Sequence, residues 1–222
     1  MCLVGKKKVL NYYCKGIDKA LFFDPLSRQE AIDCGALPPE KCMLIHWGED
    51  LNFIKEYLKN ESTSQLSDSS CSYWISSGKE RRDYNTIHYI QQHMPVDKFL
   101  YIDPSYSYLE CLHLTMNAKG VVVTPNQEGL TYCCGITNIL EAFALGKPII
   151  AVKNDHYPFD VEKEGCGFYV NSSDGKRIIE LIDMINSDDE LYMSLSNNAK
   201  RISYKYNMEL FGNELKQIID SL

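Results

Sequence analysis

The chain has 222 residues, of which 45% are hydrophobic and 24% are charged, so it can bury a sizeable core and is neither fibrous nor disordered along its whole length. Its 23 Lys and Arg against 30 Asp and Glu give a net charge of −7, which argues against nucleic-acid binding because such proteins usually carry a basic excess. No apolar stretch approaches the roughly 20 residues that span a bilayer, and we expect a soluble, cytoplasmic chain.

The first part of the chain contains two short predicted strands and one predicted helix. Lys19–Asp24 and Met43–Trp47 are apolar runs typical of buried strands, and Ser27–Cys34 is predicted to be a helix. Residues 61–70 are rich in Ser and lack apolar periodicity, so we predict a linker there. Residues 1–60 would bury too little surface to stand alone, and we interpret them as the remnant of an N-terminal acceptor domain.

After this linker, apolar strands alternate with helices. The predicted strands are Ser72–Ser76, Lys98–Ile102, Gly120–Thr124, Pro148–Val152 and Gly167–Val170. The predicted helices are Asp83–Met94, Tyr106–Asn117, Ile136–Leu145, Gly175–Asn186 and Asp188–Tyr204. Alternation of this kind is typical of α/β proteins, and continuous apolar strands suit a parallel sheet that helices cover on both faces. We therefore predict that residues 71–205 form a Rossmann-like, doubly wound parallel sheet whose ligand crevice lies at the carboxyl ends of the strands.

Residues 206–222 are predicted to form one amphipathic helix. Its apolar residues recur every three or four positions and form one stripe, made of Met208, Phe211, Leu215, Ile218 and Leu222. Such a stripe has to pack on another apolar surface. We expect the helix to pack back on the N-terminal part of the chain.

The cysteines do not indicate a disulfide scaffold or a metal site. There are 9 of them, an odd number spread over a long chain, so we expect free thiols. None form a C-x-x-C pair, and the adjacent Cys133 and Cys134 are poorly placed to ligate one tetrahedral zinc. We predict no metal ligands.

Residues 133–152 carry the most chemical information, because they read as a loop, a helix and a strand. Gly135 lets the backbone approach a ligand closely, and the amides that open the helix near Ile136 form a favourable site for a diphosphate. Glu141 follows about one and a half turns later, where its carboxylate could accept hydrogen bonds from two vicinal sugar hydroxyls. The alternative is an ordinary helix and strand with a solvated Glu141, and the residues alone leave both interpretations open.

This segment resembles the nucleotide-binding signature of GT-B glycosyltransferases of the glycosyltransferases group 1 family, in which Gly, Leu-Glu-Ala and Gly-Lys-Pro recur in this order. Three other segments resemble the family in the same collinear order. Ile75–Tyr84 is similar to the opening of the family's C-terminal domain, Lys41–Phe53 to the stretch where the chain leaves the N-terminal domain, and Glu190–Tyr206 to the terminal helices.

The resemblance implies a retaining transfer of a sugar from a UDP- or GDP-sugar to a glycan or lipid-linked acceptor, as in polysaccharide biosynthesis, with no cofactor and no metal. A lipid-linked acceptor would bring the chain to the inner membrane face as a peripheral protein. The resemblance implies that Lys79 or Arg82 neutralises the leaving diphosphate, which is a catalytic role. The residues implied to bind the donor are Gly78, Gly135, Ile136, Thr137, Asn138 and Glu141, whose carboxylate would hold the ribose.

The sequence departs from the family at two places. The family's first glutamate, eight positions before the second, falls on Cys133. Glu128 is a candidate substitute, but it precedes Glu141 by thirteen positions and would need a looped-out insertion. The other departure lies between Met94 and Gly120, where the chain has room for one strand and the family usually has two.

Two other functions stay open. A UDP-N-acetylglucosamine 2-epimerase-like enzyme shares the fold and a similar Gly-Ile, Glu, Gly-Lys-Pro run, although the segment Arg81–Tyr84 argues against it. A non-catalytic subunit that binds nucleotide-sugar is the third reading. Because residues 1–60 supply only the last elements of an acceptor domain, we expect that this chain alone does not transfer sugar. It would act as a homodimer or with a complementary N-terminal-domain chain.

Overall fold

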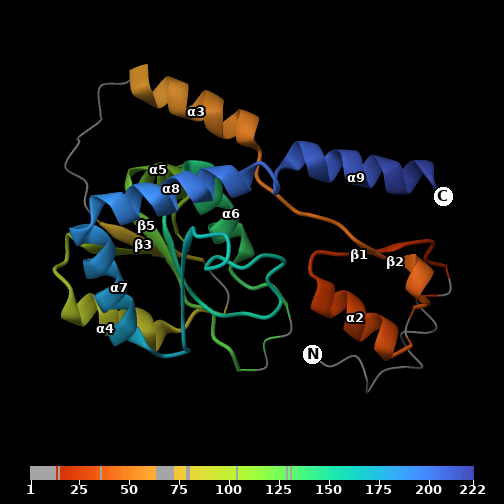
Figure 1. Ribbon diagram of the computed structural model, residues 1–222, viewed down its shortest axis with the longest axis horizontal. Coiled ribbons are helices and arrows are strands. Elements are labelled where there is room, and N and C mark those ends of the chain that lie inside the picture. Colours follow the sequence, from red (N-terminus) through yellow and green to blue (C-terminus); the bar gives the residue numbers. More distant parts are fainter. Residues whose placement is uncertain are drawn as a thin grey trace.

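The computed structural model describes residues 14, 16–35, 37–63, 73–78, 81–103, 105–128, 130 and 132–222. They form a larger α/β body, on the left of Figure 1, and a small unit near the N-terminus, on the right. Lys79 and residues 64–70 of the predicted linker lie outside the described residues.

The small unit contains both strands predicted near the N-terminus. β1 (Ala20–Phe22) and β2 (Cys42–Leu44) pair in parallel, with α2 (Pro25–Asp33) between them in the chain and a 3₁₀ turn at Pro39–Lys41. The helix begins earlier than the predicted Ser27, because Asp24 accepts a hydrogen bond from the Ser27 amide at 2.7 Å and so caps α2.

The α/β body is built on a five-stranded parallel sheet. Its strands are β3 (Trp74–Ser77), β4 (Phe99–Ile102), β5 (Gly120–Val123), β6 (Ile149–Val152) and β7 (Gly167–Val170). They lie in the order β4-β3-β5-β6-β7, and every neighbouring pair is parallel. The prediction of a Rossmann-like parallel sheet is confirmed.

Helices cover both faces of this sheet (Figure 1). On one face lie α4 (Tyr84–His93) and α7 (Gly175–Ser187), and on the other lie α5 (Tyr108–Asn117), α6 (Ile136–Leu145) and α8 (Asp189–Ser203). Neighbouring strand residues alternate between the two cores: Trp74 belongs to the α4 and α7 side, and Ile75 to the α6 and α8 side. This is why the central strands β5 and β6 are apolar without interruption, whereas β3 ends in Ser76 and Ser77. No helix among the described residues is both long and apolar enough to cross a membrane.

The helix α3 (Leu51–Thr63) was not predicted, and it extends into the predicted linker. Asp50 starts it by accepting hydrogen bonds from the amides of Asn52 and Phe53. The helix packs through Ile54 on a buried cluster that contains Leu112 of α5 and Leu145 of α6. Leu51, Ile54 and Leu58 recur at spacings of three and four residues, so the helical period was present in the sequence.

Two chain segments connect the small unit to the α/β body, and they pair with each other. The Glu49 amide donates to the Tyr206 carbonyl at 3.2 Å, and the Met208 amide donates to the Glu49 carbonyl at 3.0 Å. A side chain at Gly48 would place its Cβ 2.0 Å from the Asn207 nitrogen, so only glycine allows this approach. We call residues 45–50 and 204–208 the paired crossing.

After the paired crossing, α9 (Met208–Asp220) runs above the small unit in Figure 1. Glu214 of α9 accepts hydrogen bonds at 2.8 Å from both the backbone amide and the Nδ1 atom of His46. Within the predicted stripe, Phe211, Leu215 and Ile218 are half-buried, whereas both ends of the stripe are exposed.

Candidate functional site

The two glycines singled out in the sequence lie at the same edge of the sheet. Gly78 directly follows β3, and Gly135 directly precedes α6; their φ angles are 118° and 89°. Arg82 connects them, because a Cβ on Gly78 would lie 1.9 Å from its Nη2 atom and a Cβ on Gly135 would lie 4.0 Å from its Nη1 atom. Both positions therefore hold backbone conformations and close approaches that favour glycine.

Arg82 lies behind the turns at Gly78 and Gly135, and the residue is only 7% exposed. Its Nε donates to the Ser77 carbonyl at 2.8 Å, its Nη1 to the Cys134 sulfur at 3.3 Å, and its Nη2 to Asn138 Oδ1 at 2.8 Å. Asn138 in turn donates to the Ser77 hydroxyl. A fixed positive charge thus stands beside the N-terminus of α6, which itself favours anions.

A cavity of about 330 Å³ opens in front of these groups, a volume in the range of small-molecule sites. Its walls come from the ends of β3 and β4, the loop after β4, α5 and α6. The lining residues are Ser77, Gly78, Ile102, Asp103, Tyr106, Tyr108, Cys111, Thr137, Asn138 and Glu141. Of the predicted donor-binding residues, four line this cavity: Gly78, Thr137, Asn138 and Glu141. Gly135 and Ile136 do not line the cavity but directly precede the lining residue Thr137 in the chain. Arg82 does not line it either and bonds to the lining residue Asn138.

Glu141 lines this cavity. Its residue is 9% exposed, and its carboxylate has no hydrogen-bond or ion-pair partner in the described part of the chain. Burial raises the pKa of Glu141 to about 8, and the negative charge of Glu49 adds to the rise. A buried carboxyl group without partners is costly, and donor groups of a ligand would compensate for it.

Cys133 and Glu128 differ in their surroundings. Burial, followed by the charge of Asp24, raises the pKa of Cys133 to about 11, so its thiol is protonated at neutral pH. Glu128 is exposed and does not line the cavity. Its backbone carbonyl accepts a hydrogen bond from Arg81 Nη1 at 2.8 Å, and Arg81 has a positive φ of 49°.

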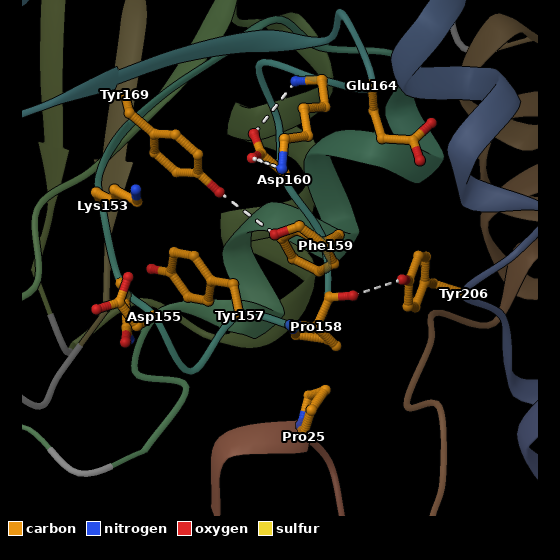
Figure 2. A pocket seen from close by; sticks show the side chains of 12 residues that line it. Pro25, Lys153, Asp155, Tyr157, Pro158, Phe159, Asp160, Glu164, Tyr169 and Tyr206 are labelled. Atoms are coloured by element: carbon orange, nitrogen blue, oxygen red, sulfur yellow. Dashed lines mark hydrogen bonds and ion pairs between the residues drawn. The ribbon is translucent and has the colours of Figure 1, made fainter.

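A second cavity, of about 430 Å³, lies between the loop after β6 and the small unit, as Figure 2 shows. The lining residues are Pro25, Lys153, Asn154, Asp155, Tyr157, Pro158, Phe159, Asp160, Lys163, Glu164, Tyr169 and Tyr206. Tyrosine hydroxyls hold the loop in place: Tyr206 donates to the Pro158 carbonyl at 3.0 Å, and Tyr157 donates to the Cys134 carbonyl at 2.8 Å. We did not predict this cavity, because its walls come from three segments far apart in the sequence.

Comparison with known proteins places the α/β body in a family. The family model described as "Glycosyl transferases group 1" matches residues 77–202. No curated protein matches the sequence. The fold is also found in many solved structures.

HepE from Anabaena, in a structure described as a complex with UDP and glucose, superposes with a TM-score of 0.68 at 14% identity, over 99% of this chain and 67% of that one. WaaG, described as a glycosyltransferase involved in lipopolysaccharide biosynthesis, gives a TM-score of 0.61 at 11% identity, over 88% of this chain and 61% of that one. Sucrose-phosphate synthase from Thermosynechococcus elongatus gives a TM-score of 0.63 at 16% identity, over 97% of this chain and 62% of that one.

At these identities the three structures show a shared GT-B fold, and this chain spans 61% to 67% of their lengths. The family match is the stronger finding, since it covers more than half of the 222 residues and includes the Gly78 turn, the Gly135 loop and Glu141. The chain therefore belongs to the glycosyl transferases group 1 family.

Proposed function

We propose that this chain is the donor-binding half of a glycosyltransferase that takes a sugar from a UDP- or GDP-sugar and transfers it, with retention, to a glycan or lipid-linked acceptor. The observation that carries the proposal is Glu141, a buried carboxyl group that has no hydrogen-bond or ion-pair partner among the described residues and lines a cavity of about 330 Å³ beside the N-terminus of α6. The family match supports sugar transfer, and the HepE structure with UDP and glucose supports a uridine nucleotide as the donor.

In this proposal Glu141 accepts hydrogen bonds from the two ribose hydroxyls of the donor. In the proposal the backbone at Gly78 and Gly135 approaches the diphosphate, and the amides of Thr137 and Asn138 in the first turn of α6 would donate to it. The Ile136 amide instead donates to the Cys133 carbonyl at 3.1 Å. This geometry suits an anion, because the Arg82 guanidinium, bonded to Asn138 at 2.8 Å, lies beside the N-terminus of α6.

The proposed catalytic groups are Arg82 and Lys79. As the sugar leaves, its anomeric carbon gains positive character and the diphosphate gains negative charge. The Arg82 guanidinium is already fixed by three protein acceptors, so it would stabilise that charge without reorganisation. Because Cys133 is protonated at neutral pH, we assign it no nucleophilic role.

Calorimetric titration of the full chain with UDP and with GDP tests the proposal. Glu141→Gln keeps the shape of the side chain and removes its charge, and it should weaken binding by about 1.5 to 3 kcal/mol, which is about 10- to 150-fold. Glu209→Gln, on the exposed surface of α9, is the matched control and should bind as the wild type does. Equal affinity of wild type and Glu141→Gln for both nucleotides would remove Glu141 from the site.

The presence of Cys133 where the family has a glutamate favours a second candidate, a subunit that binds nucleotide-sugar without turning it over. Incubation of the chain with UDP-glucose, alone and with lipid-linked acceptors, separates the two functions. Release of UDP that depends on Arg82 supports the enzyme, and tight binding without release supports the subunit. Light scattering in the same samples shows whether a second copy takes part.

A further inference from the structure

The second cavity, of about 430 Å³, is separate from the cavity that Glu141 lines, since the two share no lining residue. Its wall on the small unit is held against the loop after β6. Asp24, the neighbour of the lining residue Pro25, lies 3.1 Å from the Nδ1 atom of His156 in that loop. Pro25 faces the loop in Figure 2. The second cavity is therefore preformed, which is usual for small-molecule sites.

Aromatic side chains form a large part of its wall, namely Tyr157, Phe159, Tyr169 and Tyr206. The Phe159 ring fixes two of them, because its centroid lies 5.6 Å from that of Tyr157 and 5.3 Å from that of Tyr206. Each of the three tyrosine hydroxyls donates to a backbone carbonyl. Rings that are already fixed offer apolar surface to a ligand at little cost in side-chain entropy.

The charged groups of the wall nearly balance, with Asp155, Asp160 and Glu164 against Lys153 and Lys163. Asp160 pairs with Lys163 at 3.5 Å, and Glu164 pairs with two basic side chains of α8 and the turn after it. Lys153 and Asp155 are exposed and have no ion-pair partner in the described part of the chain. Both lie on the same side of the cavity in Figure 2, so one ammonium donor and one carboxylate acceptor are available there.

The second cavity adjoins the loop that leads into α6. The Tyr157 hydroxyl donates to the Cys134 carbonyl at 2.8 Å, and the Asn154 side-chain amide donates to the Tyr132 carbonyl at 3.0 Å. The same loop continues into the first turn of α6, whose residues line the Glu141 cavity. Ligands bound in the two cavities would therefore be separated by one loop.

We propose that the second cavity binds a neutral sugar unit and that this unit belongs to the acceptor glycan. A sugar ring has an apolar C–H face for the aromatic wall, and its hydroxyls can donate to Asp155 and accept from Lys153. A nucleotide or a sugar phosphate suits the cavity poorly, because the lining carboxylates outnumber the lining ammonium groups. Sugar binding is independent of the proposed function, whereas the acceptor role rests on it, since transfer requires acceptor and donor to lie close together.

Saturation-transfer NMR of the full chain, with and without saturating UDP, tests the proposal. The neutral probes are the methyl glycosides of glucose, galactose, mannose and N-acetylglucosamine, and glucose 6-phosphate and glucuronate are the charged probes. We expect at least one neutral glycoside to bind, both with and without UDP.

Two substitutions of exposed groups assign this binding to the second cavity. Asp155→Asn and Lys153→Met should each weaken the binding of the neutral glycoside by roughly 3- to 10-fold, because each removes the charge from one hydrogen-bonding group. Asp183→Asn on α7 and Lys216→Met on α9 make the same chemical changes at other exposed positions and should bind the glycoside as the wild type does.

Four results would overturn the proposal. They are the absence of binding by every neutral glycoside, unchanged affinity in both Asp155→Asn and Lys153→Met, preference for a charged probe over every neutral one, and loss of sugar binding when UDP saturates the chain. Glu141→Gln separates this proposal from the proposed function. If it binds UDP like the wild type while the glycoside still binds through Asp155, the role of Glu141 fails and the acceptor role loses its support. If it weakens UDP binding while no neutral glycoside binds, only the inference fails.

Discussion

The Nδ1 atom of His156 lies 3.1 Å from Asp24 Oδ1, and this contact joins the loop after β6 to the small unit. Both residues are buried, at 6% and 3% exposure. Ser27 Oγ lies 3.2 Å from the same ring nitrogen, so the hydroxyl and the carboxylate compete for one atom. In a Ser-His-Asp triad they bond to opposite nitrogens, and we therefore interpret this cluster as a structural joint.

The first prediction concerns this joint. Asp24→Ala should lower the free energy of unfolding by about 2 to 3 kcal/mol, because it removes the buried carboxylate that contacts His156 and the cap of α2. Asp24→Asn keeps the cap of α2 and should lower the free energy of unfolding by less. Urea denaturation followed by fluorescence measures both variants. If Asp24→Ala and Asp24→Asn lower the free energy of unfolding by the same amount, the cap of α2 contributes nothing to stability.

The sheet could be predicted from the sequence because its strands are continuous apolar runs, and the Gly135 loop because glycine and the following helix have a recognisable order. The opposite wall of the cavity that Glu141 lines could not be predicted. Tyr106 and Tyr108 line the same cavity as Gly78 because β4 lies next to β3, and strand order is not encoded in any local pattern. The orientation of Arg82 could not be predicted either, because its acceptors are Ser77 at the end of β3 and Cys134 and Asn138 in a segment more than 50 residues later.

The second prediction compares Gly78, which has a positive φ and a close neighbour, with Gly212, which has neither. Gly78→Ala should destabilise the protein by about 1 to 3 kcal/mol and weaken UDP binding, because φ is 118° and the new Cβ would meet the Arg82 guanidinium at 1.9 Å. Gly212→Ala in α9 is the control, since nothing lies within 4 Å of its Cβ position. It should be neutral or raise stability by about 0.5 to 1 kcal/mol. Thermal melts with and without UDP measure both.

The third prediction is a pH dependence that arises from Glu141. Its folded-state pKa is raised to about 8, so between its unfolded value of 4.5 and pH 8 the folded protein holds more protons than the unfolded chain. The stability of the unliganded protein should therefore fall as the pH rises through this window, by at most about 1.4 kcal/mol per pH unit. In the Glu141→Gln variant this decline in stability should be absent. Identical pH profiles for the two proteins in urea denaturation would show that Glu141 is solvated.

The fourth prediction concerns Lys147, which lies at the start of β6 and donates to the Ala118 carbonyl at 2.6 Å. Burial, followed by the charge of Lys200, lowers its pKa from 10.5 to about 8. Between these two values the unfolded chain holds the extra proton, so the contribution of Lys147 to stability should rise with pH from 8 to 10.5. Burial disfavours the charged form of Lys147, so the folded protein gains stability relative to the unfolded chain as the amine loses its proton.

Lys147→Met keeps the length of the apolar stem and removes the titrating group. The difference in unfolding free energy between the wild type and this variant should grow in favour of the wild type between pH 8 and pH 10. Lys216→Met, in an exposed pair with Asp220 on α9, is the matched control and should show no such trend. Because the buried tyrosines titrate equally in all three proteins, their effect cancels in the differences. A constant difference for Lys147→Met across this range would mean that Lys147 keeps its ordinary pKa and reaches water.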